Sequence, residues 1–244
     1  MRRFHSIGFV TSLFLVSAGS VSLQFAAHAQ TCDLALALAV DVSGSVDSDE
    51  YRIQMDGLAE ALRDGIVAEA LVQAHAKLLL VQWTGTSRHQ VTIPWVQIND
   101  FDDLEALASR ISNDPRRWRN FSTAIGEALA HTEEQFAQVA DCRRKVIDVS
   151  GDGVSNEGIS PERVRETLRQ AQITVNAVVI DTGDDDLAEY FREHVITGGG
   201  AFVEIAHGFE DYPERIRKKL IRETSTQISS INVPRLVDDL ASRP

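Results

Sequence analysis

The feature that most constrains the fold of this chain is an uninterrupted apolar run at residues 34–40, which stops abruptly at Asp41. A run of seven apolar residues with a polar stop is typical of a strand buried on both faces, as in a parallel sheet. Parallel sheets of this kind are covered by helices on both faces. The run therefore predicts a buried strand inside an α/β fold.

The rest of the chain alternates between short strands and amphipathic helices. Asp47 is an expected helix N-cap with Glu50 three residues later, and an apolar stripe at helical spacing follows at Met55, Leu58, Leu62 and Ile66. Pro94 makes 90–98 an edge strand. The other expected strands are 77–83, 146–149, 175–180 and 202–205, and the other expected helices are 102–111, 123–136, 161–171, 185–193 and 212–223. This alternation predicts an open, mostly parallel, doubly wound Rossmann-like sheet with one antiparallel edge strand.

The first 29 residues have the three parts of a cleavable signal peptide. Arg2 and Arg3 form a short positive region, residues 7–16 are apolar, and Ala27 and Ala29 fit a small-residue cleavage site. A membrane anchor is the alternative, but serines interrupt the apolar run, and about 20 mostly apolar residues are needed to span a bilayer. We therefore expect a signal peptide at 1–29, one folded domain at 30–226 and a tail at 227–244, in a periplasmic or secreted protein.

The charge of the chain limits the partners it can have, and its two cysteines bear on the compartment in which it folds. The whole chain has a formal net charge of −12, and removal of residues 1–29, which contain two arginines and no acid, gives −14. Such a surface repels nucleic acid and anionic lipid headgroups, so we expect no nucleic-acid partner and no membrane insertion after signal cleavage. The two cysteines, Cys32 and Cys142, form either a disulfide or two buried thiols.

The most specific local motif is Asp41-Val-Ser43-Gly-Ser45, directly after the first buried strand. Oxygen-bearing side chains at every second position can face one point if the loop curls, and Gly44 permits the curl. Carboxylate and hydroxyl oxygens are hard ligands that suit Mg²⁺, Mn²⁺ or Ca²⁺ rather than zinc. The alternative is an ordinary strand-to-helix turn with a serine cap.

Two further segments are expected to bring oxygen ligands to the same edge of the sheet. Asp152 lies just after the predicted strand 146–149, and Thr123 opens a predicted helix. In open parallel sheets, ligands bind beyond the carboxyl ends of the strands, at the point where the strand order reverses. Asp41, Asp152 and Thr123 are therefore expected to converge, with Asp148 as a rival to Asp152.

These three motifs together resemble the metal-ion-dependent adhesion site of von Willebrand factor type A domains, and the likeness covers residues 33–225. It implies that Ser43, Ser45 and Thr123 contact the metal, and that Asp41 and Asp152 bind it directly or through water. One departure is the glycine before Asp152, where the family often has Thr or Ser. The resemblance also implies that the first and fourth strands are neighbours, which would place Cys32 beside Cys142 and favours the disulfide. Within the family, the chain looks closest to small exported bacterial members of unassigned function.

A metal held largely by hydroxyls keeps much of its positive charge and an open position for a partner's Asp or Glu. The sequence therefore favours a non-enzymatic module that binds another protein through the metal. The alternatives are a hydrolase that uses the metal to activate water, and a scaffold with a structural metal. The basic segment Arg116–Arg119 either contacts a partner near the metal or forms a solvated loop. The acidic run 184–186 is either a second cation site or, more simply, a solvated helix start.

Overall fold

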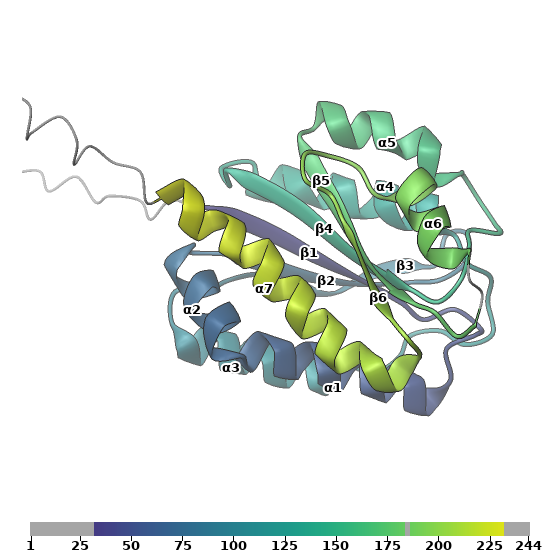
Figure 1. Cartoon of the computed structure of the whole chain (residues 1–244), viewed down its shortest axis with the longest axis horizontal. Coiled ribbons are helices and arrows are strands. Elements are labelled where there is room, and N and C mark those ends of the chain that lie inside the picture. Colours follow the sequence, from purple (N-terminus) through teal and green to yellow (C-terminus); the bar gives the residue numbers. More distant parts are fainter. Residues whose placement is uncertain (1–31, 184–185, 232–244) are drawn as a thin grey trace, which may run out of the picture.

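The computed structural model describes residues 32–183 and 186–231. The expected signal peptide and most of the expected tail lie outside these residues, as does most of the acidic run 184–186. The described residues form six strands and the helices that cover them (Figure 1). Within this part of the chain, no helix is long and apolar enough to cross a membrane.

The sheet has the strand order β3-β2-β1-β4-β5-β6. Its strands are β1 (Leu34–Asp41), β2 (Lys77–Trp83), β3 (His89–Gln97), β4 (Arg144–Gly151), β5 (Ile173–Ile180) and β6 (Val203–Ala206). All neighbouring pairs are parallel except β2 and β3. This confirms the predicted α/β fold and the antiparallel edge strand that contains Pro94. The strand order reverses between β1 and β4, so the switch point lies at their carboxyl ends.

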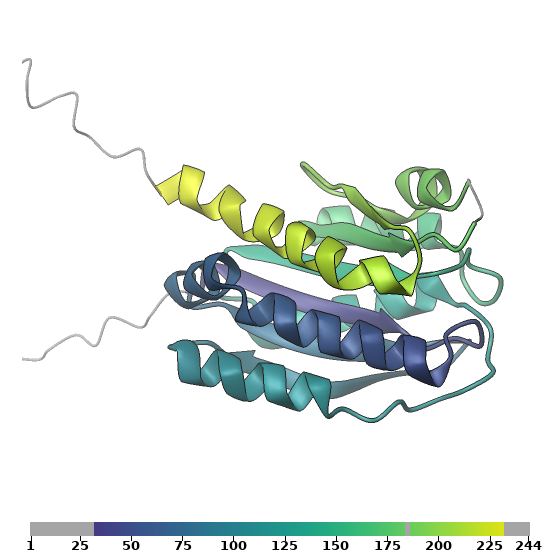
Figure 2. The ribbon, with the colours of Figure 1, turned by 60° about the horizontal axis from the view of Figure 1, so that its bottom comes forward.

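Helices cover both faces of the sheet (Figures 1 and 2). One face is covered by α1 (Ser48–Arg63), α2 (Gly65–Gln73), α3 (Phe101–Ser112) and α7 (Tyr212–Ile231). The other is covered by α4 (Ile125–Gln135), α5 (Pro161–Gln170) and α6 (Leu187–Tyr190). Short helical turns adjoin three of these helices. They are η1 (Phe136–Val139) after α4, the π-helical η2 (Phe191–Val195) after α6 and η3 (Phe209–Asp211) before α7.

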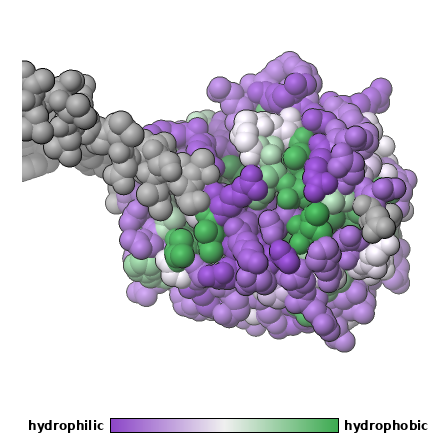
Figure 3. All heavy atoms as spheres, in the orientation of Figure 1, coloured by the Kyte–Doolittle hydropathy of each residue, from purple (hydrophilic) through white to green (hydrophobic). Residues whose placement is uncertain are grey.

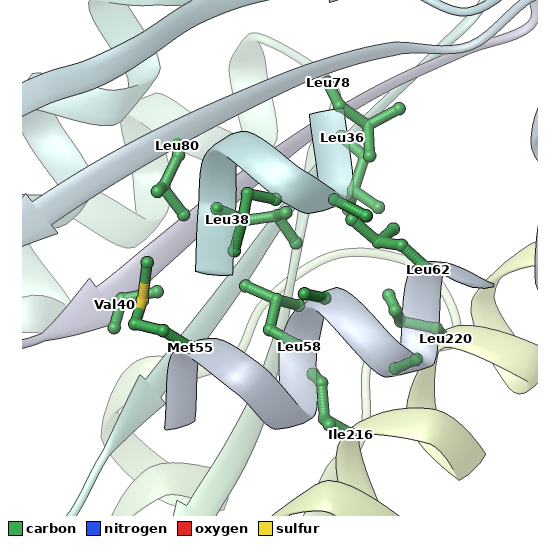
Figure 4. Packing of buried hydrophobic residues seen from close by; sticks show 14 of the residues in the cluster. Leu36, Leu38, Val40, Met55, Leu58, Leu62, Leu78, Leu80, Ile216 and Leu220 are labelled. Atoms are coloured by element: carbon green, nitrogen blue, oxygen red, sulfur yellow. The ribbon is translucent and has the colours of Figure 1, made fainter. Parts of the chain in front are cut away.

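The alternation of residue size along β1 divides the core into two layers. Leu36, Leu38 and Val40 pack against α1 and α7, where Met55, Leu58, Leu62, Ile216 and Leu220 complete the cluster (Figure 4). The intervening alanines at 35, 37 and 39 face α4 on the other side. All of these residues are buried. The outer face drawn in Figure 3 is mostly hydrophilic, with small separate hydrophobic areas.

Several helix boundaries differ from the predictions for local reasons. Asp64 caps a separate helix, α2, by accepting hydrogen bonds from Ile66 and Val67 N–H, so the chain makes two helices after β1. The helix expected from Thr123 begins at Ile125, because Thr123 is held in a loop described below. Helix α7 continues to Ile231, past the expected domain end at 226.

The disulfide expected between Cys32 and Cys142 is confirmed. Strands β1 and β4 are hydrogen-bonded neighbours, and the two Cα atoms lie 4.5 Å apart at the amino-terminal end of the pair. Arg143 N–H donates to the Cys32 carbonyl (3.0 Å), which continues the strand pairing beside the bridge. Both cysteines are buried. The bond therefore joins the two halves of the sheet at the end away from Asp41.

Candidate metal centre

The loop after β1 curls around the carboxylate of Asp41. Ser43 N–H donates to Asp41 Oδ1 (2.7 Å), and Val46 N–H donates to the Ser43 carbonyl (3.2 Å). This turn brings the Ser43 and Ser45 hydroxyl oxygens within 3.2 Å of each other. The motif thus places its alternate side chains on one side, as its spacing predicted.

The second loop, between α3 and α4, is hydrogen-bonded directly to the first loop, after β1. Gly44 N–H donates to the Phe121 carbonyl (2.8 Å). The two loops approach so closely that a β-carbon on Gly44 would lie 3.2 Å from both Asn120 Cα and the Phe121 oxygen. Residue 44 therefore has little room for a side chain. The glycine at this position allows the two loops to approach each other, and it also allows the first loop to curl.

Thr123 lies at the end of this second loop, in contact with the third. Its N–H donates to Asn156 Oδ1 (3.0 Å), and its carbonyl accepts from Asn156 N–H (2.9 Å). A β-carbon placed on Gly153 would be 4.0 Å from Thr123 Oγ1. Asn156 therefore fixes the backbone of Thr123 and leaves the buried hydroxyl beside the loop that carries Asp152.

The third loop follows β4 and closes the site. Ser45 Oγ donates to Asp152 Oδ1 (2.7 Å), which joins the first and third loops. Gly151 lies between the two acids, and a β-carbon there would touch Asp41 Oδ2 at 3.4 Å. The structure thus brings Asp41, Ser43, Ser45, Thr123 and Asp152 together at the switch point. With glycine at position 151, the third loop offers no hydroxyl beside Asp41.

Asp148, the rival to Asp152, lies in a different environment. It sits inside β4, opposite Leu38 of β1, and its carboxylate is 2.6 Å from Lys219 Nζ of α7. Ser150 is also turned away from the edge, because its hydroxyl donates to Gln54 Oε1 (2.8 Å). Asp152, on the loop after β4, is therefore the acid that lies at the candidate site.

The carboxylate of Asp41 is buried without full compensation. Oδ1 accepts the Ser43 N–H, whereas Oδ2 has no hydrogen-bond partner among the described residues. Burial, and then the negative charge of Asp152, raise the pKa of Asp41 to about 8. Burial also raises the pKa of Asp152, against the hydrogen bond from Ser45. A buried carboxylate oxygen without a hydrogen-bond partner is costly unless a cation lies beside it. These residues therefore fit a bound metal ion.

The donor set is unusual for a protein metal site, since it has two carboxylates and three hydroxyls. Within the described ranges, no group of three or more His, Cys, Asp or Glu side chains could hold a metal. The set is therefore one of hard oxygen donors with few formal charges. Such donors fit Mg²⁺, Mn²⁺ or Ca²⁺.

Two supporting residues were not identified from the sequence in their present roles. Arg116 Nη2 donates to the Val42 (3.1 Å) and Ser43 (2.7 Å) carbonyls, and these hydrogen bonds fix the backbone of the first loop. Gln54 Nε2 donates to the Asp41 carbonyl (3.2 Å) from α1. The basic segment was the only signal for Arg116, and it predicted either a partner contact or a solvated loop, rather than hydrogen bonds to the first loop. No local pattern marks Gln54, because its partner is 13 residues away in the chain.

Comparison with known proteins places the chain in a family. A family model described as "Protein of unknown function (DUF1194)" matches residues 31–228. The chain belongs to the DUF1194 family. No curated protein matches the sequence of this DUF1194 member.

Solved structures show that this DUF1194 protein has the fold of von Willebrand factor type A domains. Proximal thread matrix protein 1 from the mussel byssus is 18% identical with a TM-score of 0.62, over 78% of this chain and 47% of that one. A von Willebrand factor type A protein from Catenulispora acidiphila is 16% identical with a TM-score of 0.57, over 79% and 43%. The chain thus spans about half the length of these two proteins.

A third structure has nearly the size of the domain itself. The von Willebrand factor domain of the type V pili tip protein Mfa5 from Porphyromonas gingivalis is 9% identical with a TM-score of 0.59, over 85% of this chain and 99% of that one. The mussel protein has also been solved with a zinc-occupied metal-ion-dependent adhesion site motif, at 19% identity, a TM-score of 0.56 and coverage of 81% and 49%. These identities support a shared fold.

Proposed function

We propose that the domain is a divalent-metal-dependent module that binds another protein. The observation that carries this proposal is the buried carboxylate of Asp41, whose Oδ2 has no partner among the described residues. Asp152 and the hydroxyls of Ser43, Ser45 and Thr123 would complete the metal's protein ligands. Mg²⁺ is the expected ion, with Mn²⁺ and Ca²⁺ as alternatives, because every donor is oxygen. The metal would supply a positive centre that a partner's Asp or Glu can approach.

The surface around these loops supports a protein partner. Large exposed hydrophobic side chains are few among the described residues, and three of the five lie on loops at this edge: Phe121, Val154 and Ile159. The Arg88 guanidinium lies 4.0 Å from the centre of the Phe121 ring, which adds a positive charge to the same surface. Apolar side chains grouped beside a charged centre are typical of interaction surfaces.

We propose recognition rather than catalysis. The similar solved structures include the mussel thread matrix protein, the Mfa5 pilus tip domain and the pilus adhesin SpaC from Lactobacillus rhamnosus GG. By name, these are a thread matrix protein, a pilus tip protein and a pilus adhesin. A metal-dependent hydrolase remains the alternative, and a metal that only stabilises the fold is a second one.

Export completes the proposal. Residues 1–29 would direct the chain to the periplasm or the outside of the cell, where cleavage would release the domain. The Cys32–Cys142 disulfide supports an oxidising compartment, since such bonds are rare in the cytosol. The folded part would extend to the end of α7 at Ile231, and the remaining residues would form the tail.

Metal binding is tested by calorimetry with Mg²⁺ and Mn²⁺ on the mature protein. One site is expected in the wild type and none after Asp41→Ala. Thr123→Val removes one ligand hydroxyl, and Thr92→Val on the edge strand is the matched control, because the Thr92 hydroxyl has no hydrogen-bond partner among the described residues. Equal metal affinity in the wild type and in Asp41→Ala would refute the site.

The mode of action requires a second measurement. Affinity capture from the source organism's periplasmic or secreted fraction, with Mg²⁺ or with chelator, should yield a partner that is lost with chelator and with Thr123→Val but kept with Thr92→Val. A hydrolase screen on ester and phosphate substrates should find no turnover. Metal-dependent turnover that disappears in Asp152→Ala would favour the enzyme instead.

A further inference from the structure

A cavity lies at the amino-terminal end of the parallel strands, away from the candidate metal centre at their carboxyl ends. It has a volume of about 710 Å³ and is bounded by α5, the start of β5 and the segment after η2. Strand pairing places Lys145 beside Ile173 at this end and Gly151 beside Val179 at the metal end. Six residues of parallel strand span about 20 Å, so the cavity is separate from the metal ligands.

Three arginines line this cavity in a protein that is otherwise strongly acidic. Arg165 and Arg169 lie one turn apart on α5, and Arg192 comes from the π-helical turn η2. Arginine binds phosphate and carboxylate groups through two parallel hydrogen bonds, which makes it the residue of choice for anion recognition. Guanidinium groups from two different elements therefore point to a ligand with more than one anionic group.

The present partners of these arginines leave them able to bind a ligand. Arg165 donates to the Glu193 carbonyl, which is neutral. Arg169 pairs with Glu166, and Arg192 pairs with Glu189, each with the acid three residues before it in the chain. Exposed ion pairs at this spacing contribute little free energy, so an anionic ligand can compete for both guanidinium groups.

The backbone adds donors on the far side of the cavity. Gly198 and Gly199 line it, and within the described residues the N–H groups of Gly198, Gly199 and Gly200 donate to no protein acceptor. Gly198 has φ +99°, and a β-carbon there would lie 2.8 Å from Thr174 Oγ1 and 2.9 Å from Thr174 Cα. Only glycine fits this position, and successive free N–H groups are a recurrent anion-binding arrangement.

We propose that this cavity binds a small polyanion that carries two or more phosphate or carboxylate groups. The arginines of α5 hold one anionic group, and Arg192 with the glycine segment holds another. The volume lies in the range of about 300–1,000 Å³ found for small-molecule sites. The metal centre takes no part in this binding.

Calorimetry on the mature protein, freed of metal with a chelating resin and measured in buffer without a soluble chelator, tests the proposal, with pyrophosphate and citrate as probes. We expect saturable binding of at least one probe, and the preferred probe distinguishes phosphate from carboxylate ligands. The double change Arg165→Gln with Arg192→Gln should weaken binding at least tenfold. Amide resonances of Gly198–Gly200 should shift on titration of the ¹⁵N-labelled protein.

Arg163→Gln is the matched control, because Arg163 is an exposed arginine of α5 outside the cavity lining. It should change affinity less than twofold, and Asp41→Asn should leave affinity unchanged. If the double variant fails to fold, Arg192→Gln alone replaces it, since this side chain is exposed. Absence of binding by both probes, or an equal loss in Arg163→Gln, would overturn the proposal.

Discussion

Removal of the Cys32–Cys142 bond should lower the stability of the domain without affecting its metal site. The bond joins β1 to β4 and closes a segment of the chain with a sequence separation of 110 residues. In the chain-entropy model, a cross-link stabilises the folded state by restricting the unfolded chain, and the effect grows with the logarithm of the loop length. A loop of this length corresponds to at most about 4.8 kcal/mol at 25 °C.

This free energy converts to a measurable shift in melting temperature. For domains of this size, 1 kcal/mol changes Tm by about 2–4 °C, so loss of the full amount of about 4.8 kcal/mol, which is the upper limit, would lower Tm by about 10–19 °C. Metal affinity should remain the same, because nine residues of extended chain separate Cys32 from Asp41. They span about 30 Å at the rise of a parallel strand.

The assay is thermal unfolding followed by circular dichroism, with and without a phosphine reductant. Both cysteines are buried, so the double variant Cys32→Ala with Cys142→Ala is measured in parallel. The reductant should not change the Tm of this variant, which controls for unrelated effects of the reagent. If loss of the bond lowers Tm by less than about 2 °C, the entropy argument is refuted. Loss of Mg²⁺ binding on reduction would refute the separation of the two sites.

Three further outcomes follow from the buried charges and close contacts. In EDTA, the raised pKa of Asp41 means that the folded state holds a proton that the unfolded chain releases above pH 3.8. Stability should therefore fall as pH rises from 5 to 8, by at most about 4 kcal/mol, and Asp41→Asn should remove most of this fall in urea titrations while abolishing metal binding. Lys219→Met should cost about 3–5 kcal/mol in the same assay, because it leaves two buried acids without their cation. Gly126→Ala should destabilise by about 1–3 kcal/mol or more, since the new β-carbon would lie 2.1 Å from the Ile159 carbonyl oxygen and force the loop to move.

Local sequence patterns predicted most of the architecture because the strands are short apolar segments with polar ends. The strand expected at 77–83 coincides with β2, and Asp47 caps α1 as expected, with Glu50 accepting a hydrogen bond from the Asp47 N–H. The junction between α1 and α2 could not be predicted, because the helical spacing of apolar residues continues past it to Ile66. The Asp64 carboxylate starts α2 there, and Ile66 is exposed.

Features set by contacts between distant segments could not be predicted from local patterns. Lys219 lies in a basic stretch of α7 that resembles a solvated helix face, yet it is fully buried. Its burial depends on how α7 lies over β4 and β5. In the same way, the position of Thr123 outside its helix depends on Asn156, which lies on another loop. The sequence identified the residues that converge, whereas only the fold shows which neighbours hold them in place.

The two buried acids of the central strands show why a metal is expected at one place and not at the other. Asp148 has an internal cation, because Lys219 Nζ lies 2.6 Å from its carboxylate and 2.6 Å from that of Glu223. Asp41 is equally buried, but the nearby Arg116 directs its Nη2 to two loop carbonyls rather than to the carboxylate. Asp148 Oδ2 and Asp41 Oδ2 both lack a hydrogen-bond partner among the described residues, but only Asp148 Oδ2 has a lysine ammonium beside it, which it shares with Glu223. Because an uncompensated buried carboxylate is costly, the position of Asp41 beside four other oxygen-bearing residues supports the proposal that the protein takes a cation from solution at this place.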